Sequence, residues 1–345
     1  MSYDANKPLT DFHNARVFVD EASKQTARDR REANRKRLKN GLTANEDPQP
    51  EKFVVQGSYA MHTMVQSEVE TSDIDDGAVF ARSSLKGPRD GDKTANEAKE
   101  MVRKALSVKD EFKTPPEVRK NCVRVYYNDG FHVDIPVYRT FEEDGRTKKE
   151  IASAGEWKTS DPEDITNWFN DAVTSKSPDE TNGRQLRRIV RLLKYWSKSR
   201  SSWVMPSGFI ISVLTEEIYQ HQGWTDRDDQ ALLAVMRGIR NRLLFGERVY
   251  RPVDPREEIT NDLSLSRVRK MRDELKEAID ELSKIERSDC DELMALKAFK
   301  SVFYTDFWDK RIKELADDSG SGNSGKLFAE PKQPVDKRGG TGQYA

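Results

Sequence analysis

The sequence has few residues of the kinds that build zinc sites or disulfide frameworks. It contains only two cysteines, Cys122 and Cys290, which lie far apart, and four histidines. None of them shows a ligand spacing such as CxxC or HxxxH. A zinc site or a disulfide scaffold is therefore excluded by the spacing.

Long apolar runs and an excess of one charge are also absent. No stretch approaches the roughly 18 apolar residues of a membrane span, and the first ten residues, MSYDANKPLT, lack the charged and apolar regions of a signal peptide. The formal net charge is −1, from 59 basic and 60 acidic residues. We therefore expect a soluble, cytoplasmic protein without a membrane partner, and no general coating of nucleic acid.

What is present is a polar but foldable chain of 345 residues, with 35% apolar, 34% charged and 9% aromatic side chains. This composition and length predict about two domains rather than wholesale disorder. Basic charge is concentrated in two segments. Eight basic residues lie within 24–39, and seven lie within 184–200 without any acidic residue.

The sequence predicts four parts: a brace helix (1–45), a mixed α/β lobe (46–160), a helical lobe (161–318) and a flexible tail (319–345). Within the first, 9–39 contains neither Pro nor Gly and reads as one long helix. Strand patterns cover 53–55, 73–80, 123–127 and 131–138, and a helical pattern covers 94–106. From 161 onward helical patterns dominate, so the fold class is α+β.

Two aspartates alternate in a segment with strand character, Asp73-Ile74-Asp75-Asp76-Gly77. Side chains at positions i and i+2 leave the same face of a strand, so Asp73 and Asp75 are expected to point toward one edge. Paired carboxylate oxygens suit Mg²⁺, with Mn²⁺ as the alternative. The same pair is equally consistent with a solvated strand end. We expect Asp76 to face away and to form a turn with Gly77.

A third carboxylate, Asp134, interrupts the apolar run 131–137. Burying an unpaired carboxylate is costly, so a metal ion or a salt bridge should compensate it. With Asp73 and Asp75 it would complete the three carboxylates of a two-metal site, whose ions lie about 3.5–4 Å apart. His132 is an alternative ligand, although a packing role suits it better.

Two further features suit phosphate. The Gly57-Ser58 step is suited to place backbone N–H groups and a hydroxyl on a phosphate. The segment 184–200 has one apolar helical face and one basic face, and it leads to Ser207 and Gly208 at the start of the next helix. The basic face is either solvated or, together with Ser207, binds a triphosphate.

These motifs together resemble the polymerase-β-type nucleotidyltransferases. The longer strings carry a narrower resemblance to the bacterial cyclic-oligonucleotide synthases related to cGAS, and among these to the DncV-like group. They are Gln56-Gly57-Ser58-Tyr59, Asp73-Ile74-Asp75-Asp76-Gly77, His132-Val133-Asp134-Ile135-Pro136, and Ser160-Asp161-Pro162 leading to Trp168-Phe169. The resemblance extends over about residues 50–260, and it implies a mixed-sheet catalytic lobe braced against a helical lobe by the N-terminal helix.

The resemblance also implies site residues. Asp73, Asp75 and Asp134 would hold the metal ions and help to generate the attacking alkoxide. The expected nucleotide-binding residues are Gln56, Gly57, Ser58, Lys194, Ser207 and Asp254, with Lys194 and Ser207 on the β- and γ-phosphates. Met61 stands where the family often has an aromatic residue, which leaves the choice of base open.

The function implied is synthesis of a cyclic di- or oligonucleotide from ATP, GTP or other ribonucleotides for anti-phage signalling, with 3′,3′-cyclic GMP-AMP as the expected product. Its partners would be a downstream effector, reached through the diffusible product, and a ubiquitin-transfer-like enzyme acting on the tail; nucleic acid is not required. Two alternatives remain open. One is an enzyme that extends an RNA end, held by the basic segment 24–39, and the other is a catalytically inactive scaffold that senses a ligand.

Overall fold

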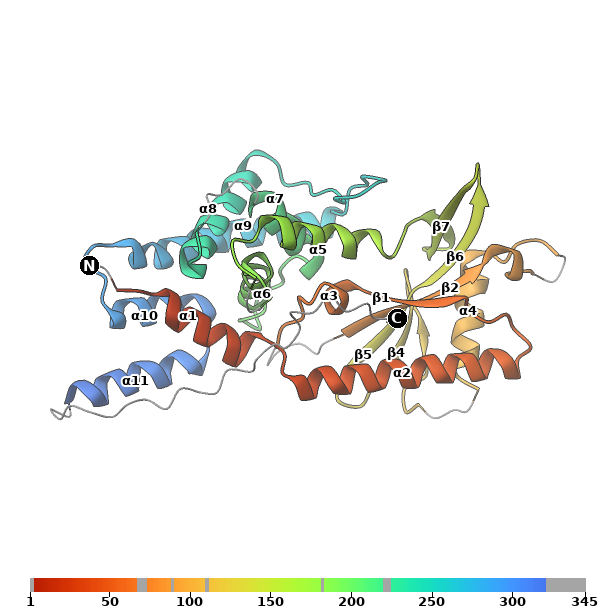
Figure 1. Ribbon diagram of the computed structural model, residues 1–345, viewed down its shortest axis with the longest axis horizontal. Helices are drawn as coiled ribbons and strands as arrows, with labels where there is room; N and C mark the ends of the chain where they lie inside the picture. The colour runs from red at the N-terminus through yellow and green to blue at the C-terminus, as the bar shows by residue number, and fades with distance from the viewer. Residues whose placement is uncertain are drawn as a thin grey trace.

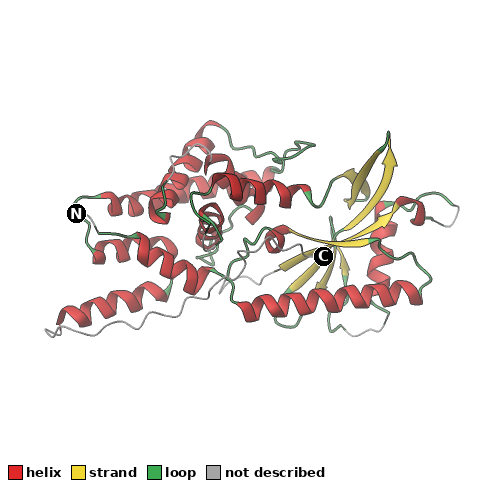
Figure 2. Cartoon of the chain, in the orientation of Figure 1, coloured by secondary structure: helices red, strands yellow, loops and turns green. Residues whose placement is uncertain are grey.

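The computed structural model describes residues 3–66, 73–87, 90–108, 112–180, 183–219 and 225–320. A mixed β-sheet with two covering helices forms one lobe, and a bundle of helices forms the other (Figure 1). The strands gather at one end of the molecule, where helices cover them, and the other end is helical (Figure 2). The α+β fold class predicted from the sequence is confirmed.

The strands are β1 (Lys52–Gln56), β2 (Asp73–Ala81), β3 (Glu117–Val118), β4 (Val123–Tyr126), β5 (His132–Ile135), β6 (Val137–Glu143), β7 (Arg146–Ser153) and β8 (Glu156–Thr159). The helices are α1 (Asn6–Phe12), α2 (Glu21–Ala44), α3 (Gly57–Ala60), α4 (Ala95–Leu106), α5 (Asp164–Lys176), α6 (Gln185–Ser197), α7 (Gly208–Tyr219), α8 (Asp228–Phe245), α9 (Asp262–Leu282), α10 (Glu292–Phe303) and α11 (Asp306–Gly320). Helix α11 includes the first two residues of the predicted tail, and 321–345 lie outside the described residues.

The sheet is built around β2. Its order among the described residues is β3-β4-β5-β2-β6-β7-β8, and β1 pairs antiparallel with β2. The first part of β2 runs parallel to β5 and the second part runs parallel to β6. The strand predicted over 131–138 is therefore two strands. They separate at Pro136, which has no N–H for a ladder and whose carbonyl accepts a hydrogen bond from Ala78 at 2.8 Å.

The predicted single helix over 9–39 is wrong, because the chain breaks between the two lobes. A π-helical turn (His13–Val17) ends α1, and Phe18 is extended and bridges to Val65. Asp20 then caps α2 by accepting a hydrogen bond from the Ser23 amide at 2.7 Å. The β-branched and aromatic run at 17–19 favours this extended conformation.

Each side of this break packs into a different core. Leu9 and Phe12 of α1 are buried with the helical lobe. Leu38 and Leu42 of α2 are buried against the sheet. The N-terminal segment thus joins the two lobes, with α2 lying along the sheet (Figure 1).

Candidate active site

The three predicted carboxylates are brought together by strand register. In the parallel pair β2·β5, Asp73 lies opposite His132 and Asp75 lies opposite Asp134. Asp73 is exposed at the start of β2, Asp75 is half-buried and Asp134 is buried. The alternation of Asp73 and Asp75 therefore directs both side chains to one face, beside Asp134.

Negative charge accumulates at this point. The pKa of Asp75 is raised to about 8, first by burial and then by the charges of Asp73 and Asp134, with Arg124 acting in the opposite direction. Gly57 lies directly against this carboxylate, since a Cβ atom at Gly57 would stand 2.1 Å from Asp75 Oδ2. Gly57 also has a φ of +67°, so glycine is required here for two reasons.

Asp134 has a partner of its own. Arg124, its cross-strand neighbour on β4, donates two hydrogen bonds of 2.7 Å to the two Asp134 oxygens. The sequence predicts either a metal ion or a salt bridge beside this buried carboxylate, and the structure shows the salt bridge. Within the described part of the chain, no three His, Cys, Asp or Glu side chains are grouped so as to hold a metal ion.

The predicted turn at Asp76 and Gly77 is wrong, because both residues lie inside β2. Asp76 is buried and accepts hydrogen bonds of 2.7 and 2.6 Å from Arg35 of α2. Gly77 leaves room for the Tyr138 ring, which a Cβ atom would approach to 2.9 Å. Asp76 is thus an ion-paired residue that attaches α2 to the sheet.

Tyr138 was not singled out in the sequence, where it stands among the apolar residues of a strand. Its hydroxyl donates a hydrogen bond of 3.0 Å to Gln56 Oε1, directly before the Gly57-Ser58 step. Burial raises its pKa, and the charges of Asp75 and Arg251 both act on it. Tyr138 therefore orients Gln56 beside the carboxylates.

Lys194 and Ser207 lie at the facing ends of two helices. Lys194 is buried, and its Nζ donates a hydrogen bond of 2.8 Å to Thr63 Oγ1. Burial, and then the charge of Lys198, lower its pKa to about 7, while the charge of Asp73 raises it. A Cβ atom at Gly208 would stand 3.5 Å from Lys194 Nζ, which places the lysine at the start of α7. Ser207 is exposed and caps α7 by accepting a hydrogen bond from the Ile210 amide at 3.3 Å.

The other candidates are more scattered. Asp254 is exposed on the segment between α8 and α9, and among the described residues no hydrogen bond or ion pair joins it to the carboxylates. The charge of Arg251, a residue of the same segment, acts on Tyr138 of β6 and on Asp164 at the start of α5. His132 packs edge-on against Tyr126, with ring centroids 5.7 Å apart. Met61 is buried in the core of the helical lobe, so its side chain offers no face to a base.

The fold is shared with known proteins. Residues 51–138 match the family model of the nucleotidyltransferase domain described as cyclic GMP-AMP synthase DncV-like. The whole fold is similar to Vibrio cholerae DncV in complex with GTP and 5MTHFGLU2, with a TM-score of 0.71, 15% identity, and coverage of 90% of this chain and 98% of that chain.

It is also similar to Vibrio cholerae DncV in complex with the linear intermediate 5′ pppA(3′,5′)pG, at a TM-score of 0.67, 16% identity and coverage of 88% and 96%. A third similar structure is the Bradyrhizobium diazoefficiens CD-NTase CdnG in complex with GTP, at a TM-score of 0.68, 15% identity and coverage of 91% and 99%. No helix in the described part of the chain has both the length and the apolar character to span a membrane. Residues 51–138, which carry Asp73, Asp75 and Asp134, therefore match a DncV-like nucleotidyltransferase domain, and the whole chain has the fold of the cGAS/DncV-like nucleotidyltransferases.

Proposed function

We propose that this protein synthesises a cyclic di- or oligonucleotide from ribonucleoside triphosphates. The observation that carries the proposal is the register of β2 and β5, which sets Asp75 beside Asp134 within a DncV-like domain. A solved relative of the same fold is a cyclic AMP-GMP synthase with the linear intermediate 5′ pppA(3′,5′)pG bound.

The donor set suits Mg²⁺, or Mn²⁺ in its place. Burial and two carboxylate neighbours raise the pKa of Asp75 to about 8, so the fold disfavours its charged form until a cation binds beside it. Asp73 and Asp75 would supply hard oxygen ligands. Asp134 would become a third ligand by giving up its ion pair with Arg124. Two such ions, when bound, activate an attacking hydroxyl and stabilise the leaving pyrophosphate.

The chain's own residues hold the nucleotide. Lys194 and Ser207 meet at the start of α7, where a lysine, a hydroxyl and a helix N-terminus together suit the β- and γ-phosphates. Gly57 brings backbone against the Asp75 carboxylate, which leaves the nucleotide close to the metal ligands. Gln56 is oriented by Tyr138 toward the same place.

We propose 3′,3′-cyclic GMP-AMP as the product and anti-phage signalling, through an effector that binds the product, as the role. A ubiquitin-transfer-like enzyme acting on the C-terminal residues 319–345 belongs to the same proposal. Co-expression with such an enzyme should give higher-mass conjugates on a denaturing gel. Their persistence after removal of Tyr344 and Ala345, or their absence with the intact chain, would reject conjugation.

The alternative of an RNA-extending enzyme loses its main support in the structure. Several cations of α2 lie over aromatic rings of the sheet lobe: Arg30 over Tyr127 at 4.5 Å, Arg35 over Phe53 at 5.1 Å and Arg37 over Phe112 at 4.3 Å. Arg35 also pairs with Asp76. These side chains are engaged in attaching α2 to the sheet rather than turned to solvent.

The test is incubation of the purified protein with Mg²⁺ and the four ribonucleotides, with and without RNA, followed by nuclease digestion and mass spectrometry. We expect pyrophosphate release and a cyclic product without RNA. Extension of the added RNA would favour the alternative enzyme, and the absence of any product would favour the ligand-sensing scaffold. A cyclic product that lacks guanine or adenine would overturn only the choice of bases. The Asp75→Asn protein is the control for contaminating activity.

A further inference from the structure

Three consecutive backbone carbonyls after α3 are held by three basic residues of α6. Arg187 Nε donates to the Met61 carbonyl at 3.0 Å, and Arg191 donates to the His62 carbonyl through Nε at 2.8 Å and a second nitrogen at 2.6 Å. Lys194 Nζ donates to the Thr63 carbonyl at 3.5 Å and to the Thr63 hydroxyl oxygen at 2.8 Å. Arg187, Arg191 and Lys194 stand at positions i, i+4 and i+7, so they share one helix face. Successive basic residues of that face therefore bond to successive residues of the loop.

The same three loop residues hold the Gly57-Ser58 step through their amides. Met61 N–H donates to the Gly57 carbonyl at 3.1 Å, His62 N–H to the Tyr59 carbonyl at 3.1 Å, and Thr63 N–H to the Ser58 carbonyl at 2.8 Å. Each of the residues 61–63 is therefore hydrogen-bonded both to α6 and to the turn at 57–59. A shift of either arginine would be transmitted to Gly57 and the Asp75 carboxylate it touches.

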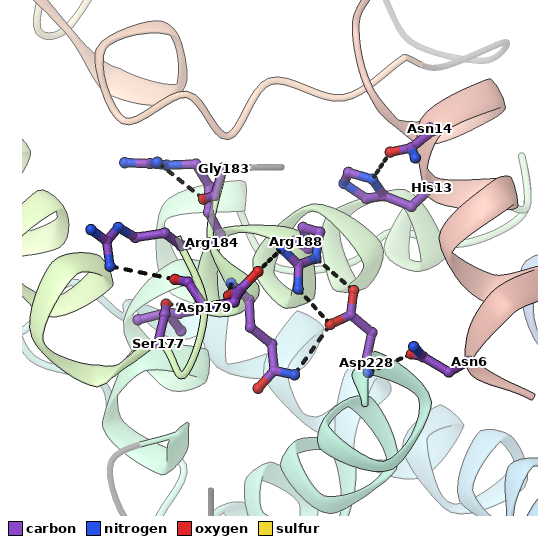
Figure 3. A network of polar contacts seen from close by, with 12 residues as sticks. Asn6, His13, Asn14, Ser177, Asp179, Gly183, Arg184, Arg188 and Asp228 are labelled. Carbon is purple, nitrogen blue, oxygen red and sulfur yellow. Dashed lines mark hydrogen bonds and ion pairs between the residues drawn. The ribbon is translucent and has the colours of Figure 1, made fainter. Parts of the chain in front are cut away.

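The opposite side of α6 is fixed in the helical lobe. Arg188, which neighbours Arg187 but faces away from the loop, donates to Asp228 at 2.6 and 2.8 Å and to Asp179 at 2.7 Å (Figure 3). Gln185 joins the same network through Asp228 at 3.2 Å. Helix α6 thus holds the loop from a position that is itself rigid.

Arg187 differs from Arg188 in its acceptors. Its remaining hydrogen bonds go to the Gly183 carbonyl at 3.1 Å and to Asn170 Oδ1 at 2.9 Å, and no carboxylate of the described residues pairs with it. Burial lowers its pKa to about 10. A half-buried cation that meets only neutral acceptors gains no ion pair in return for its desolvation, so its contribution lies in the loop carbonyl that it holds.

We propose that Arg187 and Arg191 are positioning residues, which hold the Gly57-Ser58 turn at the distance from Lys194 and Ser207 that a bound nucleoside triphosphate requires. The inference rests on the proposed function and adds to it the residues that set the geometry of the nucleotide site. Neither arginine needs to touch the nucleotide, because the loop 61–63 carries its effect.

The test compares Arg187→Gln, Arg191→Gln and Arg191→Lys with Arg200→Gln as a matched control. Like Arg191, whose guanidinium lies over the Phe18 ring at 4.9 Å, Arg200 donates to backbone carbonyls, those of Ser301 and Val302, and lies over an aromatic ring, that of Trp203 at 4.2 Å. Hydrogen exchange of the 61–63 amides, the thermal unfolding temperature, and kcat and KM for nucleotide are measured on the full chain.

We expect faster exchange at 61–63 in both loop variants, and a KM raised about tenfold or more with kcat changed much less. Arg191→Lys should recover part of the loss, and Arg200→Gln should lower the unfolding temperature without changing KM. Unchanged exchange at 61–63, or faster exchange with an unchanged KM, would overturn the proposal. A wild-type protein that binds no nucleotide would overturn the proposed function as well. That outcome is distinct from a wild type that binds nucleotide and variants that bind it equally well.

Discussion

Two groups of carboxylates in the described part of this molecule are treated in opposite ways. Around α6, Asp228 and Asp179 share the guanidinium of Arg188, with distances of 2.6 to 2.8 Å. At the start of β2, Asp75 faces two further carboxylates, Asp73 and Asp134, and its pKa rises to about 8. The first group neutralises its charge within the fold, and the second accumulates it.

The difference separates a structural role from a functional one. A buried ion pair is retained when both partners are satisfied, and breaking it leaves an uncompensated charge. A cluster of like charges costs stability, and it is expected where a cation ligand is to be bound. Asp134 stands between the two cases, because it is paired with Arg124 and also lies opposite Asp75.

Removing charge from the β2 cluster should have the largest effect, and the effect should be on turnover. Asp73→Asn and Asp75→Asn are expected to reduce nucleotide incorporation by about a thousandfold or more, because each removes a charged ligand without changing side-chain size. Pyrophosphate release at saturating Mg²⁺ measures the loss. Near-wild-type incorporation in either variant would contradict the site.

Asp76→Asn is the matched control for that comparison, since Asp76 is adjacent in β2 but pairs with Arg35. It should lower the free energy of unfolding by about 1–3 kcal/mol, the cost of leaving a charged group without its hydrogen-bond partner. Incorporation, measured well below the unfolding temperature, should be largely retained.

Breaking the α6 network should act on stability instead. Asp228→Asn is expected to lower the free energy of unfolding by about 3 kcal/mol, because Arg188 loses a charged partner in a buried setting. Urea unfolding at neutral pH measures it, with Asp75→Asn as the comparison. The separation of roles would fail if Asp228→Asn destabilised the protein no more than Asp75→Asn.

His13 is a third case to compare with the two carboxylate groups, because it is a buried titratable group that stays neutral. It lies near the α6 network (Figure 3), and burial, then the charge of Arg191, lower its pKa to about 3. At a pH between the folded pKa and the unfolded pKa of 6.5, His13 binds a proton in the unfolded chain but not in the folded one. The free energy of unfolding therefore falls as the pH is lowered through this range.

The wild type should therefore lose about 2 kcal/mol more than His13→Leu between pH 6.5 and pH 5. Urea unfolding of both proteins at the two pH values measures the difference. Parallel losses in the two proteins would show that His13 titrates normally in the fold.

The smallest effect is expected at the facing ends of α6 and α7. Lys194→Ala and Ser207→Ala should each raise KM for nucleotide by about tenfold and leave metal binding unchanged, since their expected partners are phosphates. Nucleotide titrations at fixed Mg²⁺ measure the change. Unchanged titration curves in both variants would remove Lys194 and Ser207 from the nucleotide site.

Local patterns in the sequence predicted the parts of the site that local physics determines. The alternation of Asp73 and Asp75 is a strand property, and the apolar run around Asp134 marked a second strand beside it. The basic face of α6 was visible, but its occupation by the carbonyls of 61–63 was not, because the partners are more than 120 residues apart. The pair Arg35–Asp76 and the hydrogen bond from Tyr138 to Gln56 were missed because these partners are also distant in the sequence, 41 and 82 residues apart.

The most direct test of whether the carboxylates at the start of β2 form a cation site is thermal unfolding. It is measured on the wild type and on Asp75→Asn, each with and without Mg²⁺. Without Mg²⁺ the variant should unfold at a temperature several degrees higher than the wild type, because the fold no longer holds a carboxyl group whose pKa it raises to about 8. Adding Mg²⁺ should raise the unfolding temperature of the wild type and not that of the variant. A variant that is less stable than the wild type without Mg²⁺, together with a wild type that does not respond to Mg²⁺, would contradict the account.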